Sequence, residues 1–404
     1  MNKSEIDNKS NLMILQINGG DKPGLFTQIC SYLFDLNINI LDISQNVMRG
    51  YLSITFLLDV TQAVVNKDRL DLGIQKLCKS INLNGSLYNY EEGSRSKIRN
   101  LYVFTIMGEN ISGILAKISN ILNLHKVNID TIKTQVRGGW VYNQFILDLT
   151  NTPDIKAMRN QLRFQCDELN LSMVLQYEKT YRKNKRLIAF DMDSTLVKGE
   201  TIVKIAERVN KFKEMEEKTN LAMSTNIDFE TSLRQRAQLI KGIKIEVLHE
   251  IANDLEITAG AEELIHHLKD MGWKIALISS GFSIFTDVVK ERLGIDYSFG
   301  NTLEIIDGLA TGNVLGTIID GKGKWDILTD LIDNLNITSD EVVTVGDGSN
   351  DMVMLQQSGL GIGLNSKEIA SEVADGKVKE TDVSNILLML GLSDSEIESI
   401  IHKS

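Results

Sequence analysis

Three stretches in the second half of this sequence place polar side chains directly after apolar segments. The first runs from Asp191 to Leu196, the second is Ser279-Ser280-Gly281, and the third runs from Gly346 to Asp351. A carboxylate that follows a buried strand is costly to desolvate unless it is paired or bound to a metal. Asp191 and Asp193 stand in such a place, and having two carboxylates there argues against a purely structural role.

Together these stretches contain the groups that phosphoryl transfer needs. The hydroxyl of Ser279 and backbone N–H groups at a helix start can hold a phosphoryl oxygen. The glycine-flanked acidic stretch suits a hard divalent cation bound through oxygen. Lys324, at the start of a predicted helix, can place an ammonium on the same phosphate. Each feature is weak by itself, but their order and spacing indicate a phosphoryl-transfer site.

The elements that must position these residues are buried strands separated by helices. Apolar strands are predicted at 187–190, 273–278 and 341–345, with helical patterns between them. Strands that alternate with helices predict a parallel, doubly wound sheet of the α/β class, with its site at the carboxyl ends of the strands. The three polar stretches all follow such ends.

Residues 186 to 385 resemble the haloacid dehalogenase superfamily and, within it, the phosphoserine phosphatase family. The resemblance includes the stretch from Asp191 to Ile202, with Glu200, and the more specific segment Asp228-Phe229-Glu230-Thr231-Ser232-Leu233-Arg234-Gln235-Arg236. It implies a Rossmann-like catalytic domain over 186–404 with a small helical cap at about 200–260. It also implies Mg²⁺ as cofactor and hydrolysis of O-phospho-L-serine, the last step of L-serine biosynthesis.

The resemblance also implies a role for each matching residue. Asp191 would be the nucleophile and Asp193 the general acid and base. Mg²⁺ would be held by the carboxylates of Asp191 and Asp347 and by the backbone carbonyl of Asp193. The phosphoryl group would be bound by Ser279, Ser280, Gly281, Lys324 and Asn350, with Asp351 supporting the metal shell or Lys324. The family usually has glycine at the position of Ser280.

Recognition of a serine head group requires one cation and one anion. Arg236 can bind the carboxylate through two parallel hydrogen bonds, and Glu200 can meet the ammonium. Met223 and Phe229, from the predicted cap, would form an apolar lid that excludes water during turnover. Without the family match, ordinary packing inside the cap would explain these two side chains.

The first half of the sequence contains an internal repeat. Gly24 and Asn39 recur as Gly113 and Asn128 at an offset of 89 residues. Each copy follows the order βαββαβ of a ferredoxin-like α+β unit, and both copies resemble ACT domains. We therefore expect a flexible N-terminus over 1–11, ACT domains over 12–92 and 100–178, and a charged linker from Glu178 to Arg186.

The ACT resemblance implies that an amino acid, with serine as the leading candidate, binds between modules of one or two chains. Candidate ligand residues are Gly20, Asp21 and Asn39, although turn formation and strand capping explain each of them equally well. A homodimer is expected.

Bulk composition excludes several classes of function. The net charge of −11 argues against a nucleic-acid or membrane-surface binder. The three cysteines, Cys30, Cys78 and Cys166, are expected to be buried thiols in a reducing compartment, and we expect a cytoplasmic protein. Two other functions stay open, namely a phosphatase or phosphotransferase for another small phosphomonoester and an amino-acid sensor built on the ACT modules.

Overall fold

The computed structural model describes residues 11–91, 99–137, 139–208, 228–366, 368–379 and 383–390. The chain forms two compact units, residues 1–96 and residues 97–404, and each is described by itself. The expected flexible N-terminus lies almost wholly outside the described residues. In the described part, no helix is both long and apolar enough to cross a lipid bilayer.

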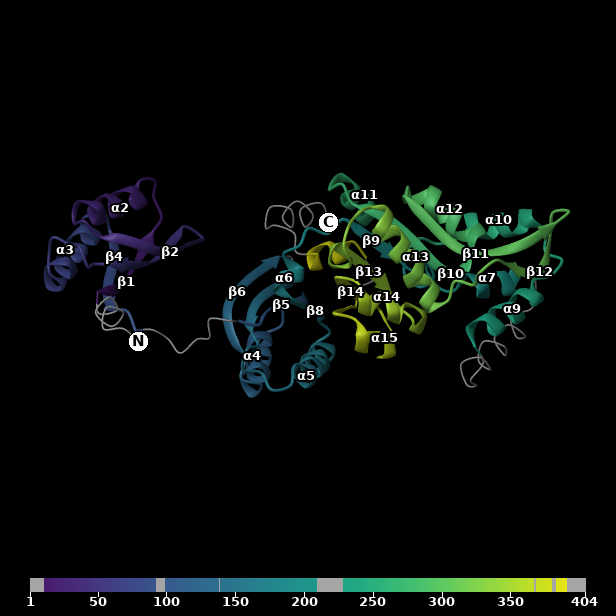
Figure 1. Cartoon of the computed structure of the whole chain (residues 1–404), viewed down its shortest axis with the longest axis horizontal. Helices are drawn as coiled ribbons and strands as arrows, with labels where there is room; N and C mark the ends of the chain where they lie inside the picture. The colour runs from purple at the N-terminus through teal and green to yellow at the C-terminus, as the bar shows by residue number, and fades with distance from the viewer. Residues whose placement is uncertain are drawn as a thin grey trace. The chain divides into compact units, whose positions relative to one another are not determined.

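The first unit is a βαββαβ module with an antiparallel sheet on which two helices pack (Figure 1). Its strands follow the spatial order β2-β3-β1-β4. The elements are β1 (Leu12–Gly20), α2 (Leu25–Asp35), β2 (Asn39–Met48), β3 (Tyr51–Asp59), α3 (Lys67–Ser80) and β4 (Leu83–Asn89). Alternate residues of β1 and β3, including Leu15, Ile17 and Phe56, are buried under the helices. The alternating apolar residues that predicted these strands therefore supply side chains to the core.

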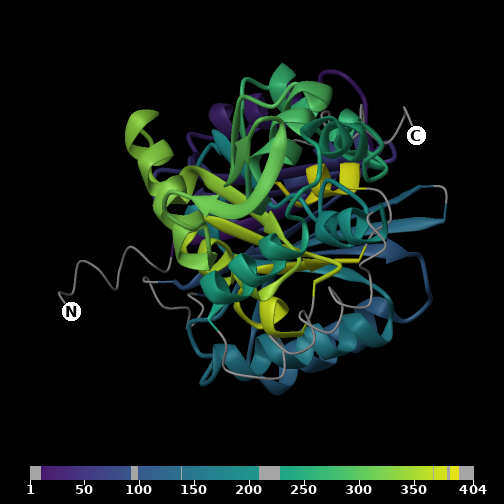
Figure 2. The same ribbon diagram turned by 90° about the vertical axis from the view of Figure 1, so that its right-hand side faces the viewer.

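The second copy of the repeat has the same fold, which confirms the sequence periodicity. Its strands follow the matching order β6-β7-β5-β8. Gly24 and Gly113 both precede a helix with φ of +91°, a backbone conformation that favours glycine. The elements are β5 (Leu101–Glu109), α4 (Ile114–Leu124), β6 (Asn128–Arg137), β7 (Trp140–Asp148), α5 (Ile155–Glu168) and β8 (Ser172–Tyr177). Helices α4 and α5 lie side by side on one face of this sheet (Figures 1 and 2).

The remainder of the second unit is the predicted doubly wound sheet. Six strands pair in parallel in the order β11-β10-β9-β13-β14-β15, and β12 adds an antiparallel strand beside β11. These strands are β9 (Leu187–Phe190), β10 (Lys274–Phe282), β11 (Tyr297–Ile306), β12 (Leu309–Leu315), β13 (Val342–Gly346), β14 (Leu360–Leu364) and β15 (Gly376–Val378). All four residues of β9 are fully buried, as expected for a central parallel strand.

Helices connect these strands, and several form the region predicted as a cap. The connecting helices are α11 (Ala261–Asp270), α12 (Ser283–Leu293), α13 (Gly321–Asn334), α14 (Met352–Gln357) and α15 (Glu368–Val373). Three short 3-10 helices are η1 (Ser339–Glu341), η2 (Ser349–Asp351) and η3 (Val383–Met389). Within the described part of the cap region lie α7 (Thr201–Arg208), α9 (Phe229–Leu239) and α10 (Ile245–Asn253).

The two sheets of the second unit are continuous. Strand β15 pairs antiparallel with β8 of the second repeat, joining Gly376 to Val174 and Lys377 to Met173. The stretch from Glu178 to Arg186, which follows β8 and was expected to be a linker, contains the short helix α6 (Glu178–Tyr181). Lys185 in this stretch is buried and donates to the carbonyls of Thr180 and Asp340, at 2.8 and 2.7 Å. These hydrogen bonds tie the stretch to the sheet domain.

Candidate active site

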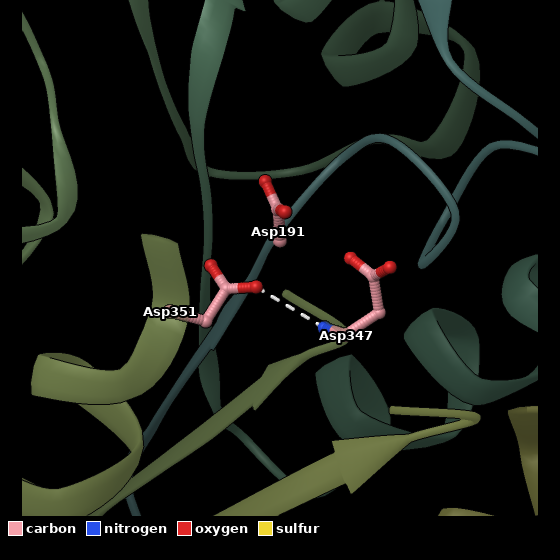
Figure 3. Close-up of side chains that lie close together, drawn as sticks. All are labelled: Asp191, Asp347 and Asp351. Carbon is pink, nitrogen blue, oxygen red and sulfur yellow. Dashed lines mark hydrogen bonds between the residues drawn. The ribbon is translucent and has the colours of Figure 1, made fainter. Parts of the chain in front are cut away.

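The carboxyl ends of β9 and β13 bring together the acidic residues predicted from the sequence. Oxygens of Asp191, Asp347 and Asp351 all lie within 4.8 Å of one another. Figure 3 shows the three carboxylates grouped where these strands end. Carboxylate oxygens are the ligands that hard divalent cations prefer, so this cluster can hold a metal ion.

Lys324 lies in the first turn of α13 and neutralises part of this cluster. Its Nζ lies 2.7 Å from an oxygen of Asp191 and 2.7 Å from an oxygen of Asp351, and its side chain is fully buried. Burial alone would lower the pKa of Lys324, but the two carboxylates outweigh burial and raise it. Lys324 is therefore a permanent cation inside the site.

Negative charge still exceeds positive charge among these buried groups. Burial, followed by the charge of Asp351, raises the pKa of Asp191 well above its usual value, and Lys324 opposes this shift only in part. A divalent cation would remove the excess and restore the anionic nucleophile. The donor set therefore fits a metal ion.

Asp351 is occupied by bonds that make it a supporting residue. One of its oxygens accepts from Lys324, and the other accepts from the backbone N–H groups of Asp347 and Gly348. Figure 3 shows the bond from the N–H of Asp347. A β-carbon at Gly346 would lie 2.4 Å from the Asp351 carboxyl carbon, so only glycine leaves room for this approach. Asp351 thereby fixes the backbone that presents Asp347.

The predicted phosphate loop, Ser279-Ser280-Gly281, forms the last part of β10, which extends to Phe282 rather than ending at residue 278, and it lies beside Asp193. Ser279 is buried, and its Oγ accepts from the N–H of Gly281 at 2.9 Å. A β-carbon at Gly281 would lie 3.7 Å from Oδ2 of Asp193, which places this glycine next to the predicted general acid. Ser280 Oγ is buried with no hydrogen-bond partner in the described part of the chain.

Asn301 is a site residue that the sequence did not reveal. Its side-chain amide donates to the carbonyl of Ser280 at 2.8 Å and accepts from the N–H of Ile319 at 2.8 Å. It therefore joins the phosphate loop to the segment that leads into α13. Nothing in the local sequence marks this buried amide, because its partners lie at least 18 residues away along the chain.

The residues predicted to recognise the serine head group lie close enough to influence one another electrostatically. Burial, followed by the charge of Glu200, raises the pKa of Asp193 to about 7. Burial lowers the pKa of Arg236, while Glu200 and then Asp193 oppose that shift. Phe229 packs against the main core of the second unit, consistent with ordinary packing. Met223 lies outside the described residues.

The predicted amino-acid ligands of the first module do not meet within that module. Gly20 is paired with Tyr51 at one end of β3, whereas Asn39 is paired with Asp59 at the other end. Strands rise about 3.3 Å per residue, so these ends are roughly 26 Å apart. Asp21, next to Gly20, shares its end of the sheet. One small ligand cannot contact all three residues in a single copy of the module.

A cavity of about 830 Å³ lies against the stretch from Ser194 to Gly199. It is lined by Ser194, Lys198, Gly199, Thr258, Ala259, Asn365, Ser366, Lys377 and Lys379. None of the predicted catalytic or phosphate-binding side chains lines it.

Comparison with known proteins decides the family. A model described as haloacid dehalogenase-like hydrolase matches residues 185–359, and an ACT domain model matches residues 11–80. A phosphoserine phosphatase of Archaeoglobus fulgidus is 37% identical over 319 residues, covering 79% of this chain and 92% of that protein. This chain belongs to the phosphoserine phosphatase family.

Other members of this family match between three quarters and nearly all of the chain. A phosphoserine phosphatase of Streptomyces coelicolor is 28% identical, covering 96% of this chain and 94% of that protein. A crystal structure of a probable phosphoserine phosphatase from Vibrio cholerae aligns with a TM-score of 0.56 and 28% identity, covering 75% of this chain and 89% of that one. The predicted haloacid dehalogenase fold with an N-terminal ACT domain is thus confirmed.

Proposed function

We propose that this chain is a Mg²⁺-dependent phosphatase that hydrolyses O-phospho-L-serine to L-serine and phosphate. The observation that carries the proposal is the buried cluster in which Lys324 contacts Asp191 beside Asp347 and Asp351. This cluster combines a nucleophile, a permanent cation and a carboxylate set for a metal. Family membership supplies the substrate class.

In the proposed reaction, Asp191 attacks phosphorus and forms an aspartyl-phosphate. Splitting one slow hydrolysis into two displacements lowers each barrier. Asp193 gives a proton to the departing serine oxygen and then takes one from the water that cleaves the acyl phosphate. Lys324 and the backbone N–H groups of the phosphate loop hold phosphoryl oxygens during both steps.

We propose that Asp191 and Asp347, with the backbone carbonyl of Asp193, hold the metal. When bound, Mg²⁺ supplies positive charge that lets an anionic nucleophile approach an anionic substrate. The backbone N–H groups of Asp347 and Gly348 both donate to Asp351, and these two bonds keep Asp347 in place for this role. Asn350, which precedes Asp351, is proposed to bind the phosphoryl group.

Substrate choice is proposed to rest on two opposite charges. Arg236 would bind the substrate carboxylate and Glu200 its ammonium, because their charges match those of a serine head group. Glu200 contributes to the raised pKa of Asp193, and Glu200 and Asp193 both oppose the lowering of the pKa of Arg236, which supports the proximity of the three residues. Ser280 would add a hydroxyl at the phosphate loop.

The decisive experiment measures phosphate release from O-phospho-L-serine with Mg²⁺ for wild type and Asp191→Asn. We expect phosphate release that needs Mg²⁺ and is abolished in the variant. With radiolabelled O-phospho-L-serine, a labelled acyl phosphate should form on wild type alone. Hydrolysis of O-phospho-L-threonine or phosphoethanolamine in preference to phosphoserine would keep the superfamily and overturn the substrate assignment. Transfer of the phosphoryl group to added alcohols would indicate a phosphotransferase.

We further propose a cytoplasmic homodimer whose ACT modules bind an amino acid, with serine as first candidate. The three unpaired thiols Cys30, Cys78 and Cys166 support a reducing compartment. Because Gly20 and Asn39 lie at opposite ends of one module, a ligand would meet them only between modules. Light scattering and serine titration of the full chain, compared with a chain that begins at residue 97, test the assembly and the effector.

A further inference from the structure

Both carboxylate oxygens of Asp193 are bonded to one residue, Thr201. The backbone N–H of Thr201 donates to Oδ1 at 3.0 Å, and its hydroxyl donates to Oδ2 at 3.0 Å. Thr201 is the first residue of α7 and is only 3% exposed. The strand β9 that carries the nucleophile is thus linked through Asp193 to the first helix of the cap region.

The two bonds differ in what they can do during a reaction. A backbone N–H can only donate, whereas a hydroxyl can donate to a carboxylate and can also accept from a carboxylic acid. The oxygen bonded to the hydroxyl, Oδ2, is the one that lies toward Gly281 of the phosphate loop. The N–H therefore holds Oδ1, and the hydroxyl holds Oδ2, the oxygen on the side of Gly281, where the phosphoryl group is proposed to bind.

We propose that Thr201 is a positioning residue that holds Oδ2 of Asp193 in place through both proton transfers of the reaction. This inference rests on the proposed function, because it needs Asp193 as general acid and base. It goes beyond that function by giving a role to a residue that neither binds the substrate nor holds the metal.

The proton on Oδ2 leaves in the first step of the reaction and is replaced in the second. In the first step the bond from phosphorus to the serine oxygen breaks, the bond to Asp191 forms, and the proton on Oδ2 moves to the serine oxygen. The Thr201 hydroxyl donates to a second lone pair of Oδ2 before and after this transfer, so the oxygen stays in place whether or not it carries the proton. In the second step water gives its proton to Oδ2 as its oxygen bonds to phosphorus and the bond to Asp191 breaks.

The test is a double-mutant cycle between Thr201 and Asp193. Thr201→Val keeps the shape and the backbone N–H but removes the hydroxyl, and Thr201→Ser restores the hydroxyl. Each variant is assayed for kcat and KM with O-phospho-L-serine, in the wild-type background and in Asp193→Asn. If Thr201 acts only through Asp193, the two effects are not additive.

Thr231→Val is the matched control, because Thr231 lies in the first turn of α9, another helix of the cap region. It donates its N–H and its hydroxyl to Asp228, at 2.9 and 2.7 Å. This pair has the same chemistry as the Thr201 pair but is exposed. Thr231→Val should leave kcat close to wild type, within about threefold.

We expect Thr201→Val to lower kcat by about 10- to 100-fold with little change in KM, since general acid catalysis is worth about 10²- to 10⁴-fold. Thr201→Ser should recover most of this loss, and Thr201→Val should cost less than about threefold in the Asp193→Asn background. An equal loss in both backgrounds, or a loss that serine does not recover, would overturn the inference.

Failure of the proposed function looks different from failure of this inference. If wild type does not hydrolyse phosphoserine, the substrate assignment fails, and the cycle is run with the phosphomonoester that is hydrolysed. A wild type inactive on every phosphomonoester would overturn both. A non-additive cycle with another ester would support the role of Thr201 and reject serine as the leaving group.

Discussion

Lys324 Nζ lies 2.7 Å from Oδ1 of Asp191, and the exposed fractions of the two side chains are 0% and 5%. Asp191, the proposed nucleophile, is thus held by a buried cation. Such a contact fixes the direction of the carboxylate before substrate arrives, which lowers the cost of reaching a reactive geometry. It also means that the stability and the chemistry of this site share one ion pair.

Replacing Lys324 with methionine should therefore harm both properties. We expect phosphate release to fall by at least about 100-fold, because an electrostatic partner of the phosphoryl group is lost. The free energy of unfolding should fall by about 3–5 kcal/mol, because Asp191 and Asp351 lose their buried cation. Urea denaturation in EDTA measures the second effect. Lys322→Met, an exposed change on the same helix, is the control, and equal effects of both variants would refute this account.

Mg²⁺ should stabilise the folded chain. At a concentration of about 100 times its Kd, a ligand that binds only the folded state adds about 2.7 kcal/mol. We therefore expect a higher Tm in Mg²⁺ than in EDTA, and a much smaller rise for Asp347→Asn. The exposed Asp326→Asn should respond as wild type does. A full response from Asp347→Asn would remove this residue from the metal site.

Stability of the metal-free protein should depend on pH through Asp193. Its pKa is about 7 in the folded state against an ordinary 3.8, so the folded state binds more protons between these values. Stability should fall as pH rises from about 4 to 7 and change no further above 7 through this group. Denaturation in EDTA at several pH values should show this fall, and Asp193→Asn should reduce it. Identical pH curves for both proteins would contradict the expectation.

Arg236 should govern selectivity for the substrate carboxylate. Phosphoethanolamine lacks that carboxylate, so Arg236→Ala should lower kcat/KM for phosphoserine by about 10- to 100-fold and leave phosphoethanolamine nearly unchanged. Arg234→Ala is the control, because Arg234 lies on the same helix but pairs with Glu230 and the carbonyl of Val314. Parallel losses on both substrates would assign Arg236 to general packing instead.

The sequence was sufficient to predict the acidic cluster and the sheet that carries it. Asp191, Lys324 and Asp351 follow strand ends or begin helices, and such places are visible as changes in apolar pattern. Thr201 was less visible, because its importance comes from two hydrogen bonds to a residue eight positions earlier. The sequence around Thr201 does not show which residue its hydroxyl bonds.

Long-range pairing and strand register were beyond the sequence argument. The contact between β8 and β15 joins segments about 200 residues apart, and neither has a distinctive pattern for an antiparallel neighbour. The separation of Gly20 from Asn39 follows from the register of β3 with its two partners. Sequence similarity to a ligand-binding motif does not reveal such a distance.

The β8–β15 pairing makes the two ACT-like copies structurally unequal. The first copy forms a four-stranded sheet of its own within residues 1–96. The second copy supplies the neighbour of β15, so cutting the chain near residue 180 would leave an open sheet edge that favours aggregation. Although three modules can be counted along the chain, calorimetry should find two melting units, and the catalytic one includes the second repeat.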